Sequence, residues 1–185
     1  MAFIKVDRSA VPARVSLSGP THSGKTLTAL YLAEGMIRAN FPELTLEQIY
    51  DKIAFIDTER GRAKFYANRD DLPFKTASFN YLEIEAPYLA TKFMDAVTMA
   101  DSLVGPGGVI IVDSLSHAWN YEGGILDRKN QKDLSGGNSY TNWAPFTSEH
   151  NKLMSVVLST QANTIVTMRS KMEYVRTQIK YLGYC

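Results

Sequence analysis

The segment GPTHSGKT, from Gly19 to Thr26, decides the fold of this 185-residue chain. It matches the phosphate-binding pattern G-x-x-x-x-G-K-[ST] at every fixed position. The residues before it, Arg14–Ser18, form a predicted β-strand, and apolar residues recur at helical spacing over Lys25–Ala39 behind it. A phosphate-binding loop joins a strand to a helix in this way, so the context supports the motif. The alternative is a glycine-rich turn that binds no ligand.

The residue types in this loop suit a nucleotide triphosphate. Gly19 and Gly24 allow the backbone to curl until successive N–H groups face one concavity, and the following helix adds its positive dipole end. We expect Lys25 to contact the β- and γ-phosphates and the Thr26 hydroxyl to bind Mg²⁺. The predicted nucleotide-binding residues of the loop are Gly19, Pro20, Thr21, His22, Ser23, Gly24, Lys25 and Thr26.

Short β-rich runs alternate with helical patterns along the rest of the chain, which is typical of a parallel sheet with helical crossovers. The further predicted strands are Lys52–Ile56, Phe74–Ser78, Val109–Val112 and Thr164–Met168. The further predicted helices are a short one within Phe41–Tyr50, capped by Thr45, and two longer ones at Pro87–Val104 and Pro145–Ala162. We therefore expect one three-layer α/β domain over residues 1–185, with a mostly parallel central sheet flanked by helices. Residues 121–141 follow neither period and contain four glycines, so we expect a mobile loop there.

The charge composition of the chain excludes one mode of nucleic-acid binding. Twenty basic residues balance 19 acidic ones for a net charge of +1, which excludes binding to nucleic acid through bulk charge. Any such contact needs a local patch, and the candidates are Arg128, Lys129 and Lys132 together with the basic and tyrosine-rich tail 169–185. The alternative for the tail is an aromatic edge that packs on the core with its lysines in solvent. The single cysteine, Cys185, fits a reducing compartment. No apolar run approaches the roughly 18 residues of a membrane span, so we expect a cytoplasmic protein.

Two strand ends supply carboxylates. Asp113 follows the apolar run VIIV and is the predicted partner of Thr26 in holding Mg²⁺, although it could instead cap the next helix. Ser114 stands where many P-loop ATPases place a glutamate, so the general base must come from elsewhere. Asp57 and Glu59 follow the second predicted strand, and the carboxyl ends of parallel strands meet in one crevice. We expect Glu59 to be the base and Asp57 to support the strand end; a solvated surface pair is the alternative.

These residues resemble a known family. The segments AFIDTERGRAKFYA, VIIVDSLSHAW and TIVTMRSK, in that order, are similar to the ATPase core of RecA-type recombinases, above all to their phage-encoded minimal relatives associated with single-strand annealing. The resemblance covers about residues 12–172. It implies a RecA-like P-loop fold that hydrolyses ATP with Mg²⁺, couples this to single-stranded DNA in phage recombination, and assembles into a homo-oligomer.

The resemblance also assigns residues. Glu59 stands where the family activates water, and Tyr66 stands where an aromatic side chain packs on adenine, although helix packing is an alternative for Tyr66. Arg169 replaces the glutamine with which RecA senses the γ-phosphate, as a charged sensor or a residue that reaches across a subunit boundary. The implied catalytic residues are thus Glu59, Lys25 and Arg169. Residues 121–141 match the first DNA-binding loop in position.

Departures from the family leave other functions open. RecA-type cores continue with further strands, whereas this sequence stops at Cys185, and both a natural end and a truncation relative to the family remain open as alternatives. A P-loop kinase acting on a small acceptor would need an arginine-rich lid. The candidate lid, residues 121–141, contains a single arginine, Arg128. A nucleotide-gated binding protein with little turnover is the other alternative. Fold analogy alone does not separate these functions.

Overall fold

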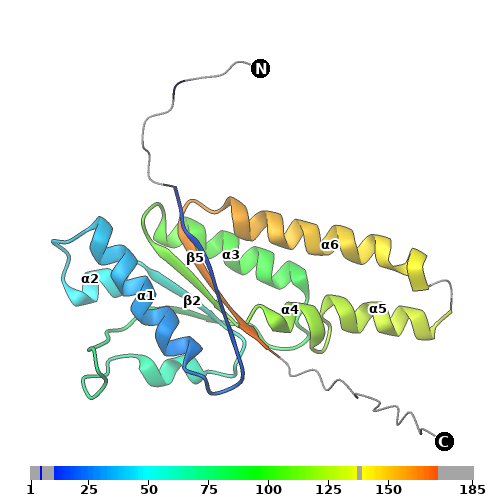
Figure 1. Ribbon diagram of the computed structural model, residues 1–185, viewed down its shortest axis with the longest axis horizontal. Helices are drawn as coiled ribbons and strands as arrows, with labels where there is room; N and C mark the ends of the chain where they lie inside the picture. The colour runs from blue at the N-terminus through cyan, green and yellow to red at the C-terminus, as the bar shows by residue number, and fades with distance from the viewer. Residues whose placement is uncertain (1–4, 6–10, 137–138, 171–185) are drawn as a thin grey trace, which may run out of the picture.

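A five-stranded sheet forms the centre of the computed structural model, which describes residues 5, 11–136 and 139–170 (Figure 1). The strand order is β1-β5-β4-β2-β3, and every pair of neighbouring strands is parallel. The strands are β1 (Arg14–Gly19), β2 (Ile53–Asp57), β3 (Asn80–Glu83), β4 (Val109–Asp113) and β5 (Asn163–Arg169). The predicted α/β class with a mostly parallel central sheet is confirmed.

Helices cover both faces of the sheet. The longer helices are α1 (Lys25–Asn40), α3 (Ala90–Val104) and α6 (Ser139–Ser159), and the shorter ones are α2 (Leu46–Tyr50), the 3₁₀ helix η1 (Arg62–Tyr66), α4 (Ser116–Asn120) and α5 (Ile125–Leu134). On β2, Ile53 and Phe55 pack in the same core as α1 and α2, while Ala54 and Ile56 pack in the core of α3 and α6. Because β2 is buried on both faces, its first four residues, Ile53 to Ile56, are all apolar rather than alternating.

The carboxyl ends of the strands meet at one edge of the sheet. The register pairs Asp57 with Asp113 at the ends of β2 and β4, and Gly19 with Arg169 at the ends of β1 and β5. In open α/β sheets, ligands bind in the crevice at this edge. The fold therefore brings residues from four strand ends, distant in sequence, to one place.

The third predicted strand is wrong. Residues 75–79 form no regular secondary structure, and β3 instead spans Asn80–Glu83. Among the described residues this strand lies at the edge of the sheet and pairs only with β2, so its four residues are half-buried. A half-buried edge strand needs no apolar run, and the sequence NYLE contains none that would mark it.

The loop predicted for residues 121–141 is also wrong, because Ile125–Leu134 forms helix α5. The helix buries only Ile125 and Lys129, so it has no apolar stripe for the sequence to display. Packing against α6 holds it in place, through an ion pair between Arg128 and Glu149. Tertiary contacts rather than intrinsic periodicity thus stabilise this helix.

Helix α6 begins at Ser139, upstream of the predicted start at Pro145, which lies inside the helix. Asn142 in this added segment donates a hydrogen bond to Asp133 of α5 at 2.9 Å, and Trp143 stacks on Trp119 of α4. These contacts favour the helical conformation despite the proline. None of the helices in the described ranges is long and apolar enough to cross a bilayer. The predicted tail contacts beyond Ser170 lie outside the described residues.

Candidate nucleotide site

The loop between β1 and α1 has the geometry of a phosphate-binding loop. Gly24 has a φ of 82°, in the left-handed region that a glycine adopts without strain. A Cβ atom at Gly19 would lie 2.8 Å from Oγ of Ser23, so any larger residue there would displace the Ser23 side chain. Nζ of Lys25 donates a hydrogen bond to the carbonyl of Pro20 at 2.7 Å, which bends the side chain back over the loop. The ammonium group is therefore held where a loop-bound anion can contact it.

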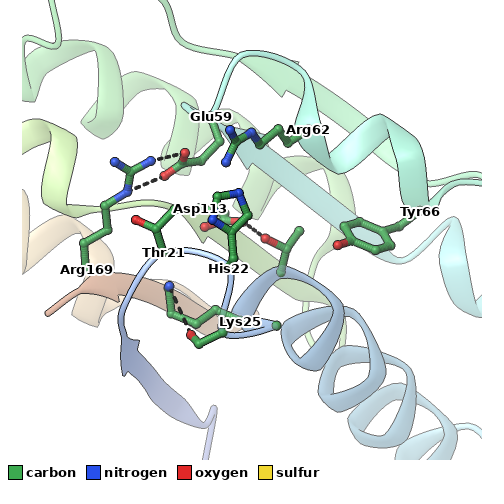
Figure 2. Close-up of a pocket in the computed structure, with 11 residues that line it drawn as sticks. Thr21, His22, Lys25, Glu59, Arg62, Tyr66, Asp113 and Arg169 are labelled. Atoms are coloured by element: carbon green, nitrogen blue, oxygen red, sulfur yellow. Dashed lines mark hydrogen bonds and ion pairs between the residues drawn. The ribbon is translucent and has the colours of Figure 1, made fainter.

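The loop forms one wall of an open cleft of about 210 Å³ (Figure 2). The other walls come from the ends of β2, β4 and β5 and from η1. The residues that line the cleft are Thr21, His22, Ser23, Gly24, Lys25, Thr26, Glu59, Arg62, Tyr66, Asp113 and Arg169. The structure thus brings together all the predicted catalytic and metal-binding residues and Tyr66, whereas Gly19 and Pro20 shape the loop behind the cleft.

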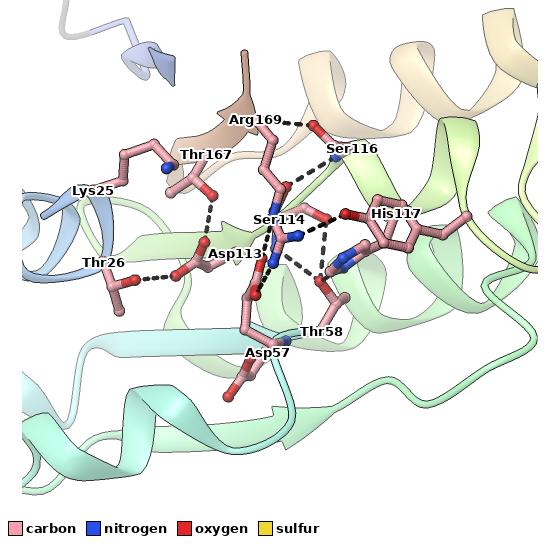
Figure 3. A network of polar contacts seen from close by, with 12 residues as sticks. Lys25, Thr26, Asp57, Thr58, Asp113, Ser114, Ser116, His117, Thr167 and Arg169 are labelled. Carbon is pink, nitrogen blue, oxygen red and sulfur yellow. Dashed lines mark hydrogen bonds and ion pairs between the residues drawn. The ribbon is translucent and has the colours of Figure 1, made fainter. Parts of the chain in front are cut away.

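The Thr26 hydroxyl and the Asp113 carboxylate meet at the bottom of the cleft. Oγ1 of Thr26 donates a hydrogen bond to Oδ2 of Asp113 at 2.5 Å, and the Thr167 hydroxyl donates to Oδ1 (Figure 3). A hydroxyl and a carboxylate are oxygen ligands of the kind that Mg²⁺ prefers, so this pair fits that ion. Within the described ranges no group of three or more His, Cys, Asp or Glu could hold a metal. The donor set therefore suits an ion that takes its remaining ligands from phosphates and water.

The position of Glu59 is set by Asp57. The Asp57 carboxylate accepts hydrogen bonds from the backbone N–H of Glu59 at 2.5 Å and of Ala63 at 3.3 Å, and from the Tyr81 hydroxyl at 3.1 Å. It is fully buried and does not line the cleft. Burial raises the pKa of Asp57, although these hydrogen bonds oppose the shift. Asp57 thus fixes the turn that carries Glu59 into the cleft.

Glu59 is paired with Arg169. Nε of Arg169 donates to Oε1 of Glu59 at 2.9 Å, and Nη2 donates to Oε2, so the guanidinium holds both carboxylate oxygens (Figure 2). Nη1 donates to the Tyr121 hydroxyl at 2.6 Å. Burial by itself lowers the pKa of Arg169, but Glu59 and Tyr121 outweigh it and raise the pKa overall. A bidentate, partly buried pair of this kind is among the stronger polar contacts in proteins.

A buried polar network lies behind the ion pair. The Thr58 hydroxyl accepts a hydrogen bond from the backbone N–H of Ser114 at 2.8 Å and contacts Nδ1 of His117 (Figure 3). Burial lowers the pKa of His117 to about 4, so the imidazole is neutral at neutral pH. Its ring stacks on Tyr88 and meets the ring of Tyr121 edge-on. The network thus connects the ends of β2 and β4 to α4.

Sequence reasoning missed three residues of this site. Arg62 lines the cleft, and its signal was its position three residues after Glu59 in the segment DTERGR. His117 and Tyr121 carried no such signal, because they fall in α4 and directly after it, in a segment without strong periodicity. Their place beside Arg169 depends on how β4, β5 and α4 pack in three dimensions.

The fold and the cleft define a P-loop nucleotide-binding domain of the α/β class. A family model described as an AAA domain matches residues 11–184, which is nearly the whole chain. The chain therefore belongs to the AAA domain family, and this membership indicates nucleotide binding and hydrolysis. A search of curated proteins finds no match.

Proposed function

We propose that this protein is a Mg²⁺-dependent ATPase of the RecA-like type. The observation that carries the proposal is the hydrogen bond between Thr26 and Asp113, inside a cleft that Lys25 and Glu59 also line. A lysine, a hydroxyl, a strand-end carboxylate and a second carboxylate are the groups that P-loop hydrolysis of a triphosphate needs. Lys25 and Thr26 belong to the loop motif, whereas Glu59 and Asp113 come from the ends of two other strands, so the convergence of the two carboxylates on the loop does not follow from the motif alone.

Each residue has a role in the proposed reaction. Backbone N–H groups of the loop and Lys25 bind the β- and γ-phosphates. Thr26 and Asp113 would hold Mg²⁺, which would neutralise charge on the phosphates. Glu59 accepts a proton from the attacking water. The water oxygen bonds to the γ-phosphorus while the bond to the bridging β–γ oxygen breaks, and ADP and phosphate leave. Tyr66 lines the cleft on η1 and is the proposed contact of the adenine ring.

We extend the proposal to single-stranded DNA as the partner, to assembly into a homo-oligomer and to a role in phage recombination, on the order of the RecA-like motifs. The structure changes which residues could contact DNA. Arg128 is paired with Glu149, and Lys129 is only 8% exposed and paired with Asp133. Of the three basic residues proposed in this segment, only Lys132 is exposed to solvent.

One observation favours a second candidate, a nucleotide-gated binding protein with little turnover. Arg169 engages both oxygens of Glu59, so the proposed base is not free to accept a proton in this conformation. The kinase alternative is weakened, because Arg128 packs against α6 and does not line the cleft. A lid arginine would have to reach the phosphates.

Phosphate release from ATP with Mg²⁺, measured with and without single-stranded DNA and with a panel of small acceptors, tests the proposal. We expect hydrolysis that DNA stimulates and that Lys25→Ala abolishes. Saturation with a non-hydrolysable ATP analogue at about a hundred times its Kd should raise Tm by about 5 to 10 °C, and Lys25→Ala should remove this shift too. Acceptor phosphorylation would support the kinase instead. Binding without turnover would support the nucleotide-gated protein.

A further inference from the structure

Arg169 lies between the phosphate loop and the proposed base, Glu59. Its backbone lies at the end of β5 beside Gly19, where the phosphate loop begins, and the N–H of Ser170 donates to the carbonyl of Gly19 at 3.2 Å. Its guanidinium, however, extends to Glu59 (Figure 2). The same group also reaches the Tyr121 hydroxyl. The backbone of Arg169 therefore lies beside the phosphate loop, while its guanidinium group is bound to the proposed base.

The Tyr121 hydroxyl also binds the guanidinium group of Arg169. Two donors of the guanidinium face Glu59, and a third, Nη1, donates to the Tyr121 hydroxyl at 2.6 Å. The guanidinium also lies over the Tyr121 ring, with Cζ 5.5 Å from the ring centroid. Three hydrogen bonds and a cation–π contact fix the orientation of a planar cation far better than the ion pair alone.

Tyr121 is itself anchored by a buried aromatic cluster. Its ring meets His117 edge-on, with centroids 4.0 Å apart, and His117 stacks on Tyr88 with centroids 4.9 Å apart. His117 contacts the Thr58 hydroxyl, and Thr58 precedes Glu59 in the chain. The contacts therefore close a ring from Glu59 through Arg169, Tyr121, His117 and Thr58 back to Glu59.

We propose that Tyr121 is a positioning residue that holds Arg169 on Glu59 while no triphosphate is bound. The ion pair is then a latch, and the terminal phosphate of a nucleoside triphosphate opens it by competing for Arg169. The γ-phosphate offers the guanidinium a doubly charged bidentate partner, and a diphosphate has no phosphate at that position. This inference rests on the proposed function, because it assigns regulation to the same site.

The test compares the affinities for a triphosphate and a diphosphate. Tyr121→Phe keeps the ring and its contact with His117 but removes the hydroxyl that accepts from Arg169. We expect this variant to bind the Mg²⁺ complex of a non-hydrolysable ATP analogue about three- to tenfold more tightly than the wild type, a fraction of what a charged hydrogen bond is worth. Its affinity for ADP should stay within about twofold, because ADP does not compete for Arg169 in this scheme.

Tyr88→Phe is the matched control. Tyr88 belongs to the same cluster and stacks on the same histidine, but its hydroxyl donates to the Thr58 carbonyl at 3.5 Å and makes no contact with Arg169. A merely structural role of the cluster would change both nucleotide affinities in both variants. The inference requires that the ratio of the triphosphate affinity to the diphosphate affinity changes in Tyr121→Phe and does not change in Tyr88→Phe.

Three results would overturn the inference. An unchanged ratio of the two affinities in Tyr121→Phe would show that the Tyr121 hydroxyl does not stabilise the ion pair between Arg169 and Glu59. Weaker triphosphate binding would show that Tyr121 instead presents Arg169 to the phosphate. If the wild type bound neither nucleotide, the proposed function would fail as well, whereas in the first two cases it would stand. Isothermal titration of all three proteins, with Tm measured for each, separates these outcomes.

Discussion

The hydroxyl of Thr26 and the carboxylate of Asp113 lie 2.5 Å apart, although the two residues are 87 positions apart in the chain. Helix α1 carries Thr26 in its first turn, and the end of β4 carries Asp113. The hydrogen bond between them joins the phosphate loop to the centre of the sheet. In the proposed reaction these two residues would hold Mg²⁺, which makes the contact a sensitive point for substitution.

The first prediction follows from this pair. Thr26→Val keeps the side-chain shape but removes the hydroxyl, so nucleotide affinity in Mg²⁺ should fall about tenfold, the usual worth of one polar contact. Affinity in EDTA should not change. Thr26→Ser should restore the Mg²⁺ effect, and Thr28→Val, an exposed position on the same helix, is the control. An equal loss in Mg²⁺ and in EDTA would remove Thr26 from the proposed metal site.

The second prediction concerns the proposed base. Glu59→Gln removes the group that accepts the proton, so turnover should fall by about 10² to 10⁴, the usual contribution of a general base. Nucleotide binding should persist and should tighten for the triphosphate, because the neutral amide holds Arg169 less strongly. Glu83→Gln is the control, since Glu83 ends the neighbouring strand β3 and pairs with Lys64 outside the cleft. Wild-type turnover in Glu59→Gln, measured by phosphate release, would place the base elsewhere.

The sequence predicted the sheet well where strands are buried on both faces. The runs at β2 and β4 are fully buried and continuously apolar, so composition alone marked them. Thr45 was correctly identified as an N-cap, because it forms a capping box with Gln48. Edge strand β3 and helix α5 were missed, since neither has to bury a full face of its own. Their structure depends on a neighbouring element.

In the candidate site, too, some residues could be predicted from local sequence signals, whereas other contacts depend on tertiary packing. The loop motif and the strand-end carboxylates are local signals, and the rule that parallel strand ends converge predicted that they meet. The pairing of Glu59 with Arg169 could not be predicted from spacing. It depends on the order of β2, β4 and β5 in the sheet, and on α4, which places Tyr121 against the guanidinium.

The third prediction concerns pH and His117. The folded pKa is about 4, while an unfolded histidine titrates near about 6.5, so between these values the unfolded chain binds a proton that the folded chain excludes. The stability that the neutral ring contributes is therefore complete above about pH 6.5 and is lost as the pH falls toward 4, by about 1 to 3 kcal/mol. The charges of Glu59, Arg169 and Arg60 also act on this ring.

Urea unfolding at pH 7.5, 6 and 4.5 measures this loss. His117→Gln should show a smaller decrease in the free energy of unfolding across this range than the wild type. His150→Gln, on α6 and away from the Thr58 network, should follow the wild type. If the wild type and His117→Gln lost stability in parallel, His117 would not be the group that titrates.

The last prediction concerns DNA. If about four phosphates of a single strand are neutralised, log K should fall with log salt with a slope of about −3, from about 0.7 per phosphate. Lys132 is exposed at the end of α5, whereas Arg128 and Lys129 are paired, so Lys132→Ala should reduce the slope by about 0.7. Lys75→Ala, an exposed lysine outside α5 and α6, should leave it unchanged. Stacking on aromatic side chains would add a salt-independent part, so binding should weaken with salt without vanishing. Fluorescence anisotropy with a labelled oligonucleotide, with and without the ATP analogue, measures all of this. If an ATP-competent protein bound no DNA at low salt, the nucleotide-gated binding protein would become the better account of the cleft.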